Sequence, residues 1–107
     1  MISGKLLITG GTGSFGSTMA KRLLRENSVD EIRIFSRDEK KQDDLRKVLN
    51  SKKVKFYVGD VRDLQAVRNA VRGIDYVFHA AALKQVPSCI SNHRLYLLKK
   101  HFHSNII

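Results

Sequence analysis

Residues 5–16 read KLLITGGTGSFG, and this stretch decides the fold. Its first part, residues 5–9, is a nearly continuous apolar run that ends in glycines, as expected of a central parallel strand covered on both faces. The apolar residues that follow recur every three or four positions, which predicts a helix. The spacing Gly10-x-x-Gly13-x-x-Gly16 therefore lies between a strand and a helix.

A glycine-rich turn in this position predicts a site for the pyrophosphate of a dinucleotide. Glycines allow a tight turn and a close approach of the backbone, and the helix N-terminus offers free N–H groups and partial positive charge. The alternative is a turn that only links the strand to the helix. The residues expected to contact the cofactor here are Gly10, Thr12, Gly13, Ser14, Phe15 and Gly16.

The downstream sequence repeats the strand–helix alternation. Further strands are expected at 31–35, 54–58 and 75–82, the last with a small-residue turn. The first helix should span about 16–26 and the third about 63–72, and Ser36-x-x-Glu39 has the capping-box pattern that opens the second. The expected inward residues are Phe15, Met19, Ala20, Leu23 and Leu24, then Leu45, Val48 and Leu49, then Leu64, Val67, Ala70 and Val71.

This alternation predicts an α/β fold, the N-terminal half of a Rossmann-type doubly wound parallel sheet with strand order 3-2-1-4. The proposed division is a nucleotide-binding half-domain at 1–89 and a divergent basic tail at 90–107 without a fold of its own. The tail contains no acidic residue, whereas the preceding chain has ten. We expect the fourth strand to be an uncovered apolar edge, which favours aggregation and marginal stability.

The end of the second strand indicates which cofactor binds. An acid there would hold the adenosine ribose of NAD, but the sequence has Ser36-Arg37, with Lys40 and Lys41 one turn later. A hydroxyl and a guanidinium suit a 2′-phosphate, so NADP is favoured. Two alternatives stay open, since Ser36 could cap its helix and Asp38 could reach a ribose. The residues assigned to the cofactor are Ser36, Arg37, Asp38, Glu39, Lys40 and Lys41.

Two later turns complete the expected site. Asp60 and Val61 follow the third strand, where a carboxylate and a backbone N–H can pair with an adenine, although Asp60 or Asp63 could instead cap a helix. After His79, interpreted as a structural histidine, small side chains would let the cofactor pass close to the backbone. These small residues are Ala80, Ala81 and Ala82.

The composition excludes several classes of protein. The net charge is +10, but basic residues are scattered among acids over the expected helix faces, so a solvated surface is favoured over a nucleic-acid site. No apolar run approaches the roughly 20 residues of a membrane helix. No secretory leader is apparent, which predicts a cytoplasmic protein. The lone Cys89 has no spacing typical of a disulfide or a metal site.

Four segments together carry a family resemblance: TGGTGSFG at 9–16, FSRDE at 35–39, GDVRD at 59–63 and HAAALKQVP at 79–87. Over about residues 3–89, the chain resembles the inverting UDP-N-acetylglucosamine 4,6-dehydratases. These enzymes belong to the extended short-chain dehydrogenase/reductases and serve capsule, O-antigen and flagellin sugar synthesis in bacteria.

The resemblance implies NADP contacts at residues 12–15, 36–41 and 60–61 and at Ala80, with Lys84 touching the cofactor and a UDP-sugar. In such enzymes NADP+ takes a hydride from sugar C4, water is eliminated across C5 and C6, and the hydride returns to C6. The family is usually homo-oligomeric. Its catalytic residues lie beyond the fifth strand, so no catalytic residue is assigned in this chain, which is expected to be inactive alone, as after a frameshift or early stop.

Two other hypotheses remain. A non-catalytic sensor module would bind NAD(P) without chemistry. A minimal reductase would use Tyr96 and Lys100, which satisfy Tyr-x-x-x-Lys and would share one face of a possible helix over 95–102. This spacing is common outside active sites, and it follows the fourth strand too soon.

Overall fold

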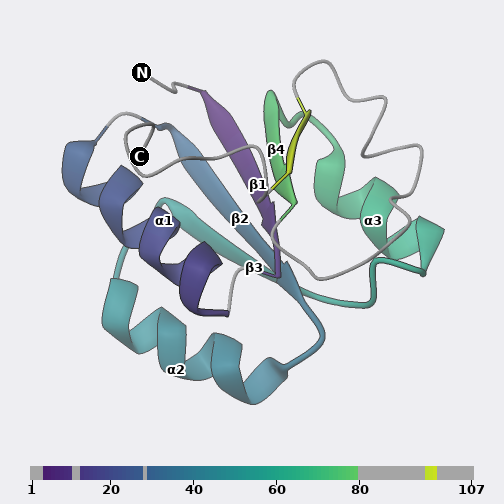
Figure 1. The fold of residues 1–107 in the computed structure, drawn as a ribbon, viewed down its shortest axis with the longest axis horizontal. Helices are drawn as coiled ribbons and strands as arrows, with labels where there is room; N and C mark the ends of the chain where they lie inside the picture. Colours follow the sequence, from purple (N-terminus) through teal and green to yellow (C-terminus); the bar gives the residue numbers. More distant parts are fainter. Residues whose placement is uncertain (1–3, 11–12, 28, 80–95, 99–107) are drawn as a thin grey trace.

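The computed structural model describes residues 4–10, 13–27, 29–79 and 96–98. Strands and helices alternate from β1 to β4, and a short fifth strand joins the sheet (Figure 1). The elements are β1 (Lys5–Thr9), α1 (Ser14–Glu26), β2 (Glu31–Ser36), α2 (Glu39–Leu49), β3 (Val54–Val58), α3 (Leu64–Val71), β4 (Tyr76–His79) and β5 (Tyr96–Leu98).

All the strand pairs are parallel, and the order β3-β2-β1-β4-β5 contains the expected 3-2-1-4 arrangement. The register places Leu6 opposite Ile32 and Ile8 opposite Ile34, while Ile8 also pairs with Phe78. Because successive side chains of a strand point to opposite faces, these residues lie on one face of the sheet, and Leu7, which pairs with Val77, lies on the other. The Rossmann-type half-sheet predicted from the alternation is confirmed.

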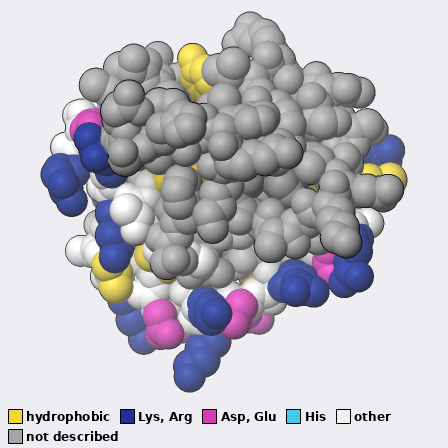
Figure 2. Space-filling view, in the orientation of Figure 1, with side chains coloured by type: hydrophobic (Ala, Val, Ile, Leu, Met, Phe, Trp, Pro, Cys, Tyr) yellow, Lys and Arg dark blue, Asp and Glu magenta, His cyan; other side chains and the backbone are white. Residues whose placement is uncertain are grey.

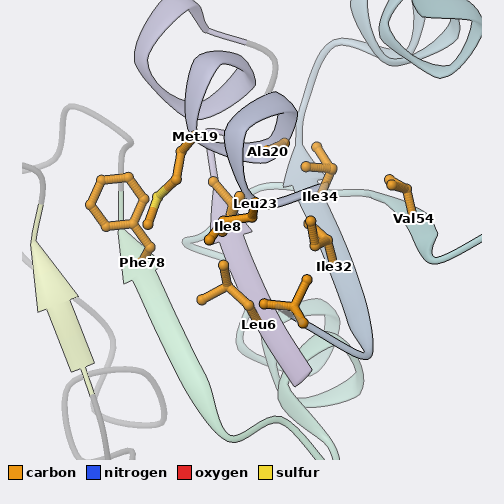
Figure 3. Packing of buried hydrophobic residues seen from close by; sticks show 10 residues of the cluster. Leu6, Ile8, Met19, Ala20, Leu23, Ile32, Ile34, Val54 and Phe78 are labelled. Carbon is orange, nitrogen blue, oxygen red and sulfur yellow. The ribbon is translucent and has the colours of Figure 1, made fainter. Parts of the chain in front are cut away.

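Two buried clusters lie on the two faces of the sheet. On the face covered by α1, Met19 and Leu23 pack with Leu6, Ile8 and Phe78 (Figure 3). The opposite face, which α3 covers, has a cluster formed by Leu7, Phe35, Val61, Val67, Ala70, Ile74 and Val77. Helices on both faces explain why β1 is a nearly continuous apolar run.

The expectations of a helix over 95–102 and of an uncovered sheet edge were wrong. Tyr96–Leu98 form a strand, where a helix over 95–102 was expected, and this strand pairs with Val77–His79 of β4. The fourth strand is therefore not an uncovered edge. The tail contributes a strand to the sheet, while the proposed boundary at residue 89 stays a prediction.

Inward positions on α2 and α3 also differ from the expectation. Leu45 is buried and Leu49 packs against the core, but Val48 is 62% exposed, and Gln42 takes the inner position one turn earlier. Positions 42, 45 and 49 cluster on one side of a helix with 3.6 residues per turn, and position 48 lies to one side of them. Leu64, at the first position of α3, is likewise 46% exposed.

Truncation of two α2 side chains should separate these positions. Leu45→Ala removes a side chain from the core and is expected to lower the free energy of unfolding by about 2–5 kcal/mol. Val48→Ala should change it by less than about 0.5 kcal/mol, as exposed substitutions usually do. Urea denaturation of both variants measures the difference. Equal losses would show that Val48 is buried after all.

Candidate functional site

The four strands β1 to β4 are parallel, so their carboxyl ends meet at one edge of the sheet. Backbone hydrogen bonds join the turns there. The Gly10 N–H donates to the Phe35 carbonyl (2.7 Å), and the Gly59 N–H donates to the Ser36 carbonyl (2.9 Å). Three motifs far apart in the sequence are thereby brought together. This is the edge at which open α/β sheets bind ligands.

The glycine turn has the backbone that its sequence predicts. Gly10 adopts a φ of 71°, a conformation that side chains disfavour. Gly13 is the N-cap of α1 and has no side chain to cap it, and the first turn of α1 contains no acid. The first N–H groups of the helix lack intrahelical partners and carry partial positive charge. The turn therefore fits an anion.

Gly13 itself supports a ligand at this turn. Its φ of −72° suits any residue, and a Cβ built there would meet only the Gly10 carbonyl, at 3.4 Å, among the described residues. Neither backbone strain nor packing in that part of the chain requires a glycine. The missing side chain leaves space for the phosphates of a cofactor. The residues present therefore fit a dinucleotide.

A hollow of about 560 Å³ opens at the end of β2 and the start of α2. Arg37 and Lys41 provide its positive charges, and its lining consists of Ser36, Arg37, Asp38, Glu39 and Lys41. Lys40 is exposed on α2 and does not line the hollow. Five of the six residues assigned here to the cofactor thus lie around one space.

The capping-box expectation for α2 was wrong. Asp38, rather than Ser36, is the N-cap, and its Oδ1 accepts the Lys41 N–H at 3.0 Å. Ser36 is the last residue of β2 and is 8% exposed. Its hydroxyl is held by Gln42, an α2 residue that the sequence did not single out. Only the apolar spacing of Leu45 and Leu49 could have placed Gln42 on the inner side.

Asp60 lies beside this hollow and holds two arginines. The Arg62 guanidinium and backbone N–H both donate to its carboxylate, with a shortest side-chain distance of 2.7 Å, and Arg37 Nη1 lies 3.7 Å from Oδ2. The hydrogen bonds from Arg62 hold the pKa of Asp60 well below its usual range. Its stabilising contribution is therefore present above the ordinary carboxyl pKa and is lost only as the pH falls towards the lowered value.

Asp63 is the residue that caps α3, accepting the N–H groups of Gln65 and Ala66. This leaves the Asp60 carboxylate outside the capping role, next to Arg37. The Val61 side chain packs into the α3-side core, so only its backbone could face a cofactor.

Several predicted residues lie outside the described residues: Thr12, Ala80, Ala81, Ala82, Lys84 and Lys100. The backbones of Ser14 and Phe15 begin α1. Tyr96 lies in β5, so the helical face that it was expected to share with Lys100 is wrong.

Figure 2 shows one face of the molecule, with Lys and Arg side chains spread around the visible rim and Asp and Glu among them. Such mixing is typical of a solvated surface. Among the described residues, no helix is long and apolar enough to cross a membrane.

Comparison with known protein families identifies the family of this chain. Residues 6–105 match the family model described as polysaccharide biosynthesis protein. The chain belongs to this family. The match crosses the proposed boundary at residue 89.

The chain is also similar to curated proteins. A Rickettsia prowazekii protein named UDP-glucose 4-epimerase is 62% identical over 87 residues, which cover 78% of this chain and 26% of that protein. The chain thus spans about a quarter of the length of the curated relatives it matches.

Two solved structures share the fold. Pen from Bacillus thuringiensis is 37% identical with a TM-score of 0.69, and the match covers 82% of this chain and 28% of that one. The UDP-glucose 4-epimerase of Thermus thermophilus, solved in complex with NAD, is 27% identical with a TM-score of 0.59. That match covers 82% of this chain and 27% of the epimerase. In both structures the match covers about a quarter of a longer chain.

Proposed function

We propose that this chain is the NADP-binding portion of an enzyme that modifies a UDP-sugar for surface polysaccharide synthesis. The observation that carries the proposal is the pair of cations, Arg37 and Lys41, that line the hollow at the end of β2. Arg37 is 73% exposed at its side chain, and its contact with Asp60 is 3.7 Å long. Exposed ion pairs of this kind are weak, so the guanidinium can turn to a phosphate at little cost.

We assign each part of the cofactor to a different group of residues. The turn from Gly10 to Gly16 would hold the pyrophosphate, and Arg37 and Lys41 would hold the 2′-phosphate. Asp60 and the Val61 backbone would meet the adenine. We assign Ala80, Ala81, Ala82 and Lys84 to the ribose and nicotinamide side, with Lys84 also reaching the sugar nucleotide, because their segment resembles that of the dehydratases.

For the whole enzyme we propose 4,6-dehydration of UDP-N-acetylglucosamine, because FSRDE at 35–39 and AALKQVP at 81–87 resemble that group. The curated relatives are named for 4-epimerisation of UDP-glucose, which is the second candidate. In either case a bound nicotinamide supplies a hydride acceptor for the sugar. We assign no catalytic residue to this chain and expect no turnover from it alone. A cytoplasmic location and homo-oligomeric assembly are further proposals for the whole enzyme.

Thermal unfolding with NADP+ and with NAD+ tests the cofactor assignment. A ligand that binds only the folded state stabilises it, by about 2.7 kcal/mol at a hundredfold excess over its Kd. We expect NADP+ to raise the Tm at lower concentrations than NAD+ does. A stronger response to NAD+ would contradict the proposal, and so would no response to either nucleotide.

A further inference from the structure

Gln42 is a buried polar residue that lies behind the proposed phosphate site. It is 1% exposed, on the side of α2 that faces the sheet. Its Nε2 donates to the Tyr57 carbonyl (2.8 Å) and to the Ser36 hydroxyl (2.9 Å), with a longer contact to the Ser36 carbonyl (3.4 Å). One amide thus joins α2 to the ends of β2 and β3.

The chemistry of these partners fixes the orientation of the amide. Carbonyl oxygens only accept hydrogen bonds, so the group facing Tyr57 and Ser36 must be the NH₂ end of the side chain. One of its hydrogens is directed to the Tyr57 carbonyl. The other is left for Ser36, whose hydroxyl oxygen is the nearer of its two acceptors there.

This arrangement sets the role of the Ser36 hydroxyl. A hydroxyl whose oxygen accepts from an amide retains its own proton for donation elsewhere. Among the described residues, Gln42 is the hydrogen-bond partner of Ser36 Oγ, and Ser36 lines the hollow that also holds Arg37 and Lys41. Phosphate oxygens at neutral pH mainly accept, so a directed O–H donor matches them.

We propose that Gln42 is a positioning residue for cofactor specificity: by donating to Ser36 Oγ, it directs the Ser36 hydroxyl proton to the 2′-phosphate of an adenine nucleotide. The proposal rests on the proposed function, because it assumes that the hollow takes this phosphate. Gln42 itself does not touch the ligand.

The test compares two small nucleotides that differ only in the presence of a 2′-phosphate. Adenosine 2′,5′-bisphosphate and adenosine 5′-monophosphate are titrated into the wild-type chain and into Gln42→Met, Ser36→Ala and the double variant. The readout is the Kd for the monophosphate divided by the Kd for the bisphosphate. A purely structural loss would weaken both nucleotides alike and leave this ratio unchanged.

Each single variant should reduce the preference for the bisphosphate roughly tenfold to a hundredfold, as expected for one hydrogen bond to a charged group. The double variant should lose no more than either single variant, since both single changes act on the same contact, the donation of the Ser36 hydroxyl to the phosphate. Gln65→Met is the matched control, because Gln65 is exposed on α3 and bonds to Asn69. Its ratio should equal that of the wild type.

The outcomes separate the two proposals. A wild-type chain without preference for the bisphosphate overturns the NADP site itself. A preference that survives in Gln42→Met overturns only the role of Gln42. If Gln42→Met does not fold, Ser36→Ala still decides, because it keeps both carbonyl contacts of Gln42: an unchanged ratio overturns the proposal, and a reduced ratio supports it.

Discussion

Charge reversal at Arg37 should abolish the preference for NADP+ over NAD+. In Arg37→Glu, the hollow at the end of β2 loses one of its two cations and gains a third carboxylate beside Asp38 and Glu39. Loss of a charge-assisted contact and the new repulsion together should raise the Kd for NADP+ by about 100-fold or more. The Kd for NAD+ should change only a few-fold. Isothermal titration calorimetry with both nucleotides measures this.

Lys52→Glu provides the control for the change in net charge. Lys52 is exposed in the turn before β3, at the amino end of that strand, whereas the hollow lies at the carboxyl end of β2. Its reversal should leave the affinities for both nucleotides nearly unchanged at physiological salt, where screening is strong beyond about 8 Å. If Arg37→Glu and Lys52→Glu weaken NADP+ equally, general electrostatics rather than a 2′-phosphate contact explains the binding.

Truncation of Phe35 should have the largest effect on stability. Phe35 is 1% exposed in the α3-side cluster, and its backbone carbonyl accepts the Gly10 N–H. Phe35→Ala is expected to lower the free energy of unfolding by about 3–5 kcal/mol through lost burial and the resulting cavity. Domains are commonly stable by only about 5–15 kcal/mol, so this change removes much of the margin. Urea denaturation gives the value.

Val58→Ala is the matched control in the neighbouring strand, since Val58 is 53% exposed. It should change the unfolding free energy by less than about 0.5 kcal/mol. Phe35 also fixes the packing of Gly59, where an added Cβ would lie 2.9 Å from the Phe35 ring. The prediction fails if Phe35→Ala is no more costly than Val58→Ala, since that would mean that the ring is not packed in the core.

The expected marginal stability was argued from an uncovered β4, and in the structure β4 is covered by another strand. The sequence suggested an open apolar edge, whereas β5 pairs with Val77–His79. The pairing partner comes from a segment without clear strand periodicity. The position of β5 depends on pairing with β4, and this pairing joins parts of the chain that are distant in sequence.

Local signals were sufficient for most of the fold. The apolar run at 5–9, the glycine spacing and the helical period after it predicted β1, the turn and α1, because each depends on neighbouring residues. Asn27 ends α1 in a left-handed conformation, and Gly73 follows α3 with a φ of 77°, as their types favour. The parallel order 3-2-1-4 followed from the alternation and the handedness of crossovers.

By itself, then, the sequence determined the Rossmann-type half-sheet and the chemical types present at its carboxyl edge. Only the tertiary structure decided how those groups are used: Asp38 rather than Ser36 caps α2, Asp60 pairs with Arg62 and Arg37, and Gln42 holds the Ser36 hydroxyl. Capping patterns and helix period are local properties of the chain. The partners of a polar side chain are set by strands that meet only after folding, so their distances cannot be read from spacing along the sequence.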